Sequence, residues 1–250
     1  MDLRESLIYP DWPAPASVKA LQTTRLGGIS AAPYDTLNLG LHVGDDPVRV
    51  NRNRQMLAPL MPSEPVWLEQ VHGTVVANAD AAACRVQADA CIARQRGSVC
   101  VIMTADCLPV LLCDETGTVV GAAHAGWKGL AAGVIEATVK EMAVEPRKLM
   151  AWLGPAIGPH AFEVGAEVRA TFMAHDAKAA EAFLPSPSGG GAGGGKYHAD
   201  IYLLARQRLS ALGIARISGG TFCTYHEKGK FFSYRRDGVT GRMGTFIWLG

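Results

Sequence analysis

The feature that most constrains the fold is a series of apolar segments between residues 97 and 125, GSVCVIMTADCLPVLLCDETGTVVGAAHA. Each segment is short enough for a buried strand, and GTVV after DET is typical of a hairpin. An acid and a thiol, Asp106 and Cys107, nevertheless stand directly before the apolar segment LPVLL. A carboxylate and a reactive sulfur at the start of a buried strand indicate a functional role in addition to packing.

The composition indicates a globular protein. Hydrophobic residues make up 48% of the 250 residues, which favours a well-filled core over disorder. The net charge of +1 and the charged fraction of 19% do not indicate a nucleic-acid partner. No signal peptide and no run of about 18 apolar residues is visible. We therefore expect a cytoplasmic monomer that engages neither a membrane nor nucleic acid.

The cysteines do not form a metal-binding motif of short spacing. The six are Cys84, Cys91, Cys100, Cys107, Cys113 and Cys223. No CxxC pair occurs, and most of these residues alternate with Val, Leu and Ala. Five of the six are best interpreted as small buried hydrophobic residues in a reducing compartment. Cys107 is the candidate exception.

The order of elements indicates one α+β domain spanning 1–250. Residues 66–76 alternate like a strand, residues 129–142 have an amphipathic helical spacing, and a second amphipathic helix ends at Gly213. Residues 186–196, SPSGGGAGGGK, predict a flexible surface loop. The alternation of strands and helices resumes after this loop, so we do not expect a domain boundary there.

Three short motifs place a His or a Cys at a strand end. They are QVHG at 70–73, TADC at 104–107 and AHAGW at 123–127, which present His72, Cys107 and His124. One thiolate and two imidazoles suit Zn²⁺ and leave a fourth position for water or substrate. A Cys–His nucleophile pair needs the same side chains, and histidines satisfied by backbone groups are the third interpretation. The residues alone leave all three open.

Longer motifs resemble a known family along most of the chain. From about residue 20 to the C-terminus the sequence is similar to the laccase-domain family, also called YfiH-like or polyphenol-oxidase. The resemblance rests on TTRLGG, PYDTLNLGLHVGDDP, LEQVHG, TADCLPVLL, AHAGWKGLAAGV, WLGPAIGP and FFSYRRDGVTGRM. It implies a four-layer αββα sandwich similar to the cysteine-hydrolase domain of certain bacterial toxins. It also implies zinc bound by His72, Cys107 and His124.

The same resemblance implies an activity. Family members are described as purine nucleoside phosphorylases that act on adenosine, inosine, guanosine and methylthioadenosine, with adenosine deaminase activity. The partners are then purine nucleosides and phosphate. We expect Arg25 to bind phosphate, because its guanidinium is forked and permanently charged, and Asn38 to bind base or ribose edges. Asp106 is expected either to orient a histidine or to serve as a turn residue.

Alternative functions use the same side chains. Cys107 can act as the nucleophile of a cysteine hydrolase or of a factor that edits peptidoglycan precursors, and a non-catalytic role in cell-wall synthesis is the third class. A copper-dependent polyphenol oxidase is disfavoured. Multicopper sites use several His-x-His pairs, whereas this chain has seven histidines and no such pair.

Overall fold

The computed structural model describes residues 3–81, 86–187 and 195–250. Its strands form three sheets. A six-stranded sheet has the order β11-β7-β5-β6-β3-β2, with bounds Arg216–Gly219, Leu149–Leu153, Leu108–Asp114, Val120–Ala125, Ala90–Ala93 and Val76–Asn78. A three-stranded sheet has the order β1-β12-β4, with bounds Val18–Gln22, Met243–Leu249 and Val99–Thr104. A smaller sheet has the order β8-β10-β9, with bounds Glu163–Gly165, Lys196–Ala199 and Phe183–Pro185.

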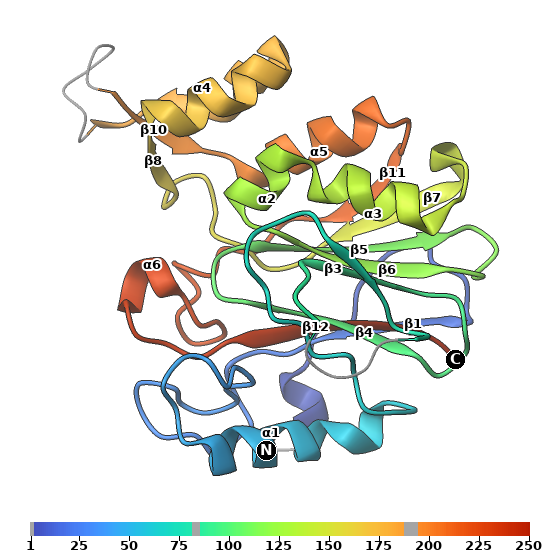
Figure 1. Cartoon of the computed structure of the whole chain (residues 1–250). Helices are drawn as coiled ribbons and strands as arrows, with labels where there is room; N and C mark the ends of the chain where they lie inside the picture. Colours follow the sequence, from blue (N-terminus) through green and yellow to red (C-terminus); the bar gives the residue numbers. More distant parts are fainter. Residues whose placement is uncertain (1–2, 82–85, 188–194) are drawn as a thin grey trace.

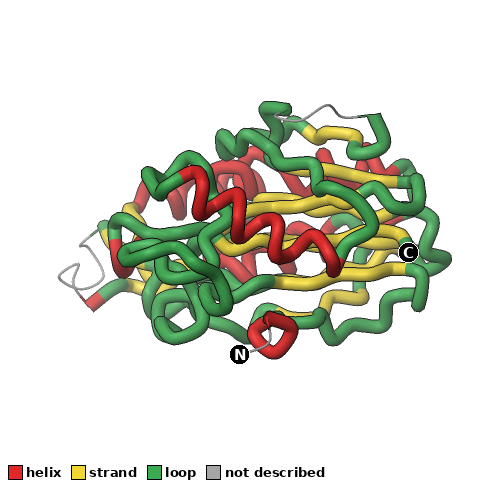
Figure 2. The backbone as a smooth tube through the Cα atoms, turned by 90° about the horizontal axis from the view of Figure 1, so that it is seen from below, coloured by secondary structure: helices red, strands yellow, loops and turns green. Residues whose placement is uncertain are grey.

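The helices lie outside the two larger sheets. Their bounds are α1 Pro47–Leu57, α2 Trp127–Ala132, α3 Val134–Met142, α4 Ala166–His175, α5 Ile201–Ala211 and α6 Tyr234–Asp237. Short 3₁₀ helices occupy Leu3–Ser6, Ala58–Leu60, Pro146–Lys148 and Ala177–Ala182. Helices α2, α3 and α5 cover one face of the six-stranded sheet, and the three-stranded sheet lies against its other face (Figure 1). Helix α1 runs across the outer side of the three-stranded sheet (Figure 2).

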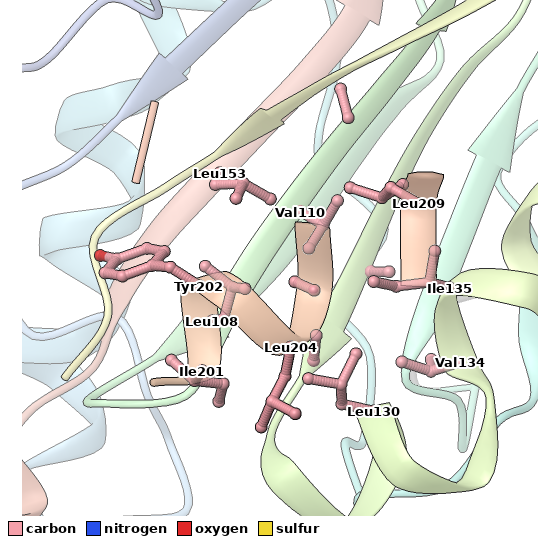
Figure 3. Close-up of a cluster of buried hydrophobic side chains, with 14 of the residues drawn as sticks. Leu108, Val110, Leu130, Val134, Ile135, Leu153, Ile201, Tyr202, Leu204 and Leu209 are labelled. Carbon is pink, nitrogen blue, oxygen red and sulfur yellow. The ribbon is translucent and has the colours of Figure 1, made fainter. Parts of the chain in front are cut away.

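Strand β5 explains why LPVLL is apolar throughout. All seven of its residues are buried, because the strand has neighbours on both faces and both edges. Leu108, Val110 and Leu112 face the core under α2, α3 and α5, where Leu130 and Leu204 also pack (Figure 3). Leu111 and Cys113 face the three-stranded sheet instead. Successive side chains of a strand point to opposite faces of the sheet, so β5 contributes alternate side chains to two different cores.

The β5–β6 hairpin is closed by its own acidic residue. Asp114, at the end of β5, accepts hydrogen bonds from the backbone N–H groups of Thr118 and Val119 and from the hydroxyl groups of Thr116 and Thr118. The strands pair antiparallel from Leu108↔Ala125 to Cys113↔Val120. The predicted hairpin is thus confirmed.

Two local predictions were wrong. The expected helix over 129–142 is two helices, because Gly133 adopts φ +100° and ends α2 before α3 begins. The expected strand over 66–76 is a loop with isolated bridges at Val66 and Glu69, and β2 begins only at Val76. The predicted helix ending at Gly213 is confirmed, since α5 ends at Ala211 and Gly213 has φ +92°.

The fold is mixed α/β with several sheets, as expected for the α+β class. Part of the predicted glycine-rich loop, residues 188–194, lies outside the described residues, as does Cys84. Among the residues that the structure describes, no helix combines the length and apolarity needed to cross a membrane. The assignment of 1–250 to one domain stays a prediction.

Candidate active site

Three strand connections bring His72, Cys107 and His124 together. Cys107 directly precedes β5, His124 lies near the end of β6, and His72 is in the loop before β2. Because β5 and β6 are antiparallel, with Pro109 opposite His124, the start of one strand lies beside the end of the other. The potential ligand atoms of the three side chains all lie within 4.8 Å of one another, and Sγ of Cys107 is 3.7 Å from Nε2 of His72.

A buried carboxylate that the sequence did not identify holds this cluster. Asp89, fully buried before β3, accepts a 2.8 Å hydrogen bond from Nδ1 of His124. The same carboxylate accepts hydrogen bonds from the backbone N–H groups of Val71, His72 and Gly73, with N···O distances of 3.1, 2.8 and 2.7 Å. It therefore fixes one histidine through its ring and the other through its backbone, which has φ +62° at His72. Nε2 of His124 is left for a ligand or a proton.

Asp106 does not orient a histidine. Its carboxylate accepts a 2.6 Å hydrogen bond from the hydroxyl of Thr224 and a 2.7 Å hydrogen bond from the backbone N–H of Arg235. Its own backbone has φ +91°. The histidine-orienting interpretation was therefore wrong, and the carboxylate instead joins Thr224 to the first turn of α6. The signal that was missed is an acid before an apolar strand, which QADACIA shares with TADCLPVLL.

The glycine of AHAGW is required by the cluster itself. A Cβ atom on Gly126 would lie 2.8 Å from Cδ2 of His72 and 2.9 Å from Sγ of Cys107. Gly126 also precedes the first residue of α2, Trp127, which packs against the large core under the helices. A side chain at position 126 would displace two of the three clustered side chains.

The cluster favours a thiolate. Burial alone would raise the pKa of Cys107, but His124 and then His72 hold that pKa at about 6. Burial would likewise lower the pKa of His124, yet Cys107 and Asp89 raise that pKa to about 9. The two groups stabilise each other as thiolate and imidazolium. The opposite holds for Cys113 in the core, where burial raises the pKa to about 12.

A cavity of about 420 Å³ opens onto the cluster. It is lined by His42, Gln70, His72, Met103, Thr104, Ala105, Cys107, His124, Tyr234 and Arg242. No carboxylate belongs to this set of described residues, whereas one guanidinium does. Its volume lies within the range of small-molecule sites.

Arg25 and Asn38 do not line this cavity. Arg25 forms an ion pair with Asp35 at 3.2 Å and donates from Nε to the Asp35 carbonyl. Asn38 is fully buried, and its Oδ1 accepts a 2.9 Å hydrogen bond from the backbone N–H of Arg242. Their roles in substrate binding stay predictions. The structure shows instead that Asn38 positions the segment that carries Arg242 into the cavity.

The donor set fits the metal that the sequence suggested. Two imidazoles and a thiol with a lowered pKa converge, and a cavity borders them on the open side. One histidine also has its other ring nitrogen bound by a carboxylate, the arrangement usual for metal-bound histidine. These residues could hold a zinc-like ion and leave a position for water or substrate.

Comparisons with known proteins assign the family. Residues 19–250 match the family described as multi-copper polyphenol oxidoreductase laccase, to which the chain belongs. It is 56% identical to purine nucleoside phosphorylase YfiH of Escherichia coli K12, over 97% of this chain and 98% of the relative. It is 54% identical to purine nucleoside phosphorylase PA4543 of Pseudomonas aeruginosa, over 97% and 98%.

Solved structures agree with this assignment. The Neisseria meningitidis protein NMB0706 is 49% identical and superposes with a TM-score of 0.92, over 98% of this chain and 99% of the other. YlmD of Geobacillus stearothermophilus is 32% identical, with a TM-score of 0.81 over 95% and 93%. The resemblance to the YfiH-like family is thereby confirmed.

Proposed function

We propose that this chain is a zinc-dependent purine nucleoside phosphorylase. The observation that carries the proposal is the His72–Cys107–His124 cluster at the wall of a cavity. Among the described residues, a guanidinium but no carboxylate lines that cavity. Relatives more than 50% identical over nearly the whole chain carry the name purine nucleoside phosphorylase. The substrates would be adenosine, inosine, guanosine and methylthioadenosine. Phosphate oxygen bonds to C1′, the bond from C1′ to the purine breaks, and the departing base takes up a proton.

Different residues of the chain would bind the metal ion and orient its ligands. His72, Cys107 and His124 would hold the zinc ion, and Asp89 would fix the His124 ring with Nε2 towards the ion. When bound, zinc supplies a Lewis acid and lowers the pKa of a coordinated water. That chemistry also supports the proposed adenosine deaminase activity, in which the oxygen of water bonds to C6 of adenine and the amino group leaves as ammonia.

A cysteine hydrolase is the second candidate, favoured by one specific observation. Asp89, His124 and Cys107 form an acid–imidazole–thiolate series, and the pKa of Cys107 is lowered to about 6. This arrangement activates a nucleophile without any metal. Such an enzyme would act on an amide, including a peptidoglycan precursor, and would keep its activity in the presence of a chelator.

Copper-dependent polyphenol oxidation is disfavoured despite the family description. Seven histidines without a His-x-His pair do not supply the ligands of a multicopper centre. We propose further that the helices and the two large sheets make the four-layer αββα sandwich of the toxin cysteine-hydrolase domain. The protein would act as a cytoplasmic monomer, in which the five described cysteines are free.

Metal analysis combined with turnover tests the proposal. Protein purified without added metal is analysed for zinc and copper, then supplied with adenosine and phosphate, and the products are separated by chromatography. About one zinc per chain, with adenine and ribose-1-phosphate formed, supports the phosphorylase, and inosine adds the deaminase. Cys107→Ala should abolish both metal and turnover, whereas Cys113→Ala, a core thiol on β5, should preserve them. No zinc and no nucleoside turnover would overturn the proposal.

A further inference from the structure

One buried hydroxyl in the cavity wall has no partner. Thr104, the last residue of β4, is 1% exposed, and its Oγ1 makes no hydrogen bond within the described structure. Buried polar groups are nearly always hydrogen-bonded, so an unpaired one calls for a missing partner. Among the residues that the structure describes, three other buried side-chain atoms share this condition, on Glu136, Arg169 and Thr240, and of these four only Oγ1 of Thr104 belongs to a residue that lines the cavity beside Cys107.

A guanidinium with free donors lines the same cavity. Strands β4 and β12 pair with Thr104 opposite Met243, and Arg242, the residue directly before β12, also lines the cavity. Its Nη1 donates to the carbonyl oxygens of Thr240 and Gly241, while Nε and Nη2 make no hydrogen bond to any described residue. Threonine and arginine thus offer three donor atoms to the cavity, Oγ1 of Thr104 and Nε and Nη2 of Arg242.

The surroundings of these donors favour a negative ligand. No carboxylate is among the described lining residues, and the cavity also contains His42. Burial lowers the pKa of His42, and the charges of Arg242 and Arg54 lower that pKa further. The positive charges of Arg242 and Arg54 therefore act on this part of the cavity and favour an anion there, against the opposing charges that Cys107 and Asp106 exert on Arg242. Arg242 itself is held by Asn38 and by close contact of its Cγ with Gly40, where a Cβ atom would lie only 2.9 Å away.

We infer that Thr104 and Arg242 form a phosphate subsite, in which Oγ1 of Thr104 and Nε and Nη2 of Arg242 donate to the oxygens of inorganic phosphate. This inference rests on the proposed phosphorolysis, for which it supplies the site of the second substrate. It assigns the anion to a different part of the chain from Arg25, whose guanidinium is engaged by Asp35. Thr104 is a specificity-determining residue for phosphate, because it is a donor that the protein leaves unpaired.

The test is the isosteric variant Thr104→Val in zinc-loaded protein, with KM measured separately for phosphate and for adenosine. Loss of one hydrogen bond to a charged group should raise the KM for phosphate about tenfold or more, with the KM for adenosine unchanged. Thr104→Ser should restore the wild-type value. Thr138→Val is the matched control, because it removes a buried threonine hydroxyl on α3 that lies outside the cavity lining.

Calorimetric titration with phosphate alone and with adenosine 5′-monophosphate separates the inference from the activity. If the wild type turns nucleosides over and Thr104→Val leaves the KM for phosphate unchanged, or raises only that for adenosine, the inference fails. If the wild type has no turnover, the proposed function fails. Phosphate binding that Thr104→Val and Arg242→Gln both weaken would still support the subsite, and absence of phosphate binding would overturn it. Weakened binding of the nucleotide alone would also overturn it, because the anion would then be part of the nucleoside substrate.

Discussion

The carboxylate of Asp89 lies 2.8 Å from Nδ1 of His124 and 2.8 Å from the backbone nitrogen of His72. A single buried side chain therefore orients two of the three residues that could bind a metal. It does so from the position directly before β3. The geometry of the cluster therefore depends on Asp89 as well as on its three members.

Asp89→Asn should weaken metal binding without removing a ligand. The amide cannot accept from all three backbone N–H groups and hold the imidazole in the same way, so zinc affinity should fall about 10- to 100-fold. Competition with a chromophoric chelator measures this change. Asp114→Asn is the control, because Asp114 is a buried carboxylate at the opposite end of β5. Equal zinc affinity in both variants would contradict the orienting role.

Gly126→Ala should disrupt the cluster through shape alone. The new methyl group would contact His72 and Cys107 at under 3 Å, so both side chains must move. We expect loss of bound zinc and of turnover with the fold retained, measured by elemental analysis and circular dichroism. Gly229→Ala, where a Cβ atom meets nothing within 4 Å, should behave as the wild type. Full zinc occupancy in Gly126→Ala would show that the contact is unimportant.

Cys107 should react as a thiolate in metal-free protein. With its pKa at about 6, the rate of alkylation by iodoacetamide should reach half its maximum near pH 6, well below the ordinary thiol value. Mass spectrometry after a short exposure locates the label, and Cys223→Ser removes the other half-buried thiol. Added zinc should protect Cys107. A midpoint near pH 9 would contradict the thiolate–imidazolium pair.

Asp114 should contribute to stability at neutral pH and lose that contribution in acid. Burial opposes ionisation, but hydrogen bonds from Thr116, Val119 and Thr118 outweigh it and lower the pKa of Asp114 below its ordinary value of 3.8. The folded protein then binds this proton less readily than the unfolded chain, so the stabilisation is complete above about pH 4 and declines as the pH falls through the folded pKa.

The Asp114→Asn variant measures that contribution. Urea unfolding at pH 7 should show a loss of about 1–3 kcal/mol, since the hairpin loses acceptors for buried donors. The difference between variant and wild type should shrink towards pH 3. A difference that stays constant over this range would show that ionisation of Asp114 is not what stabilises the turn.

The sequence predicted the three residues of the cluster but not Asp89, the carboxylate that holds two of them. His72, Cys107 and His124 were recognisable because Cys and His at strand ends are unusual, and antiparallel pairing then brought them together. Asp89 resembles any acid before a strand, and only the tertiary structure shows four donors converging on it.

Other local features depended on partners distant in sequence. Residues 66–75 alternate between apolar and polar side chains like a strand but form only isolated β-bridges. Alternation alone was therefore not sufficient to predict a strand. Gly133 ends one helix and begins the next because its backbone is left-handed. The apolar spacing of residues 129–142 does not predict that backbone angle. Asn38 and Arg242 are 204 residues apart in the sequence. Their hydrogen bond forms only when the tertiary structure brings the two segments together.

The position of β12 has a consequence for how the chain assembles on the ribosome. It is the central strand of the β1-β12-β4 sheet, yet it is synthesised after every other strand described. Until it emerges, β1 and β4 each lack their shared neighbour and present unpaired edges. The six-stranded sheet, with Cys107, His124 and Asp89, can form earlier, whereas Arg242 arrives last. The proposed metal site can therefore form in the growing chain before the proposed phosphate subsite, which is complete only when the last strand is inserted.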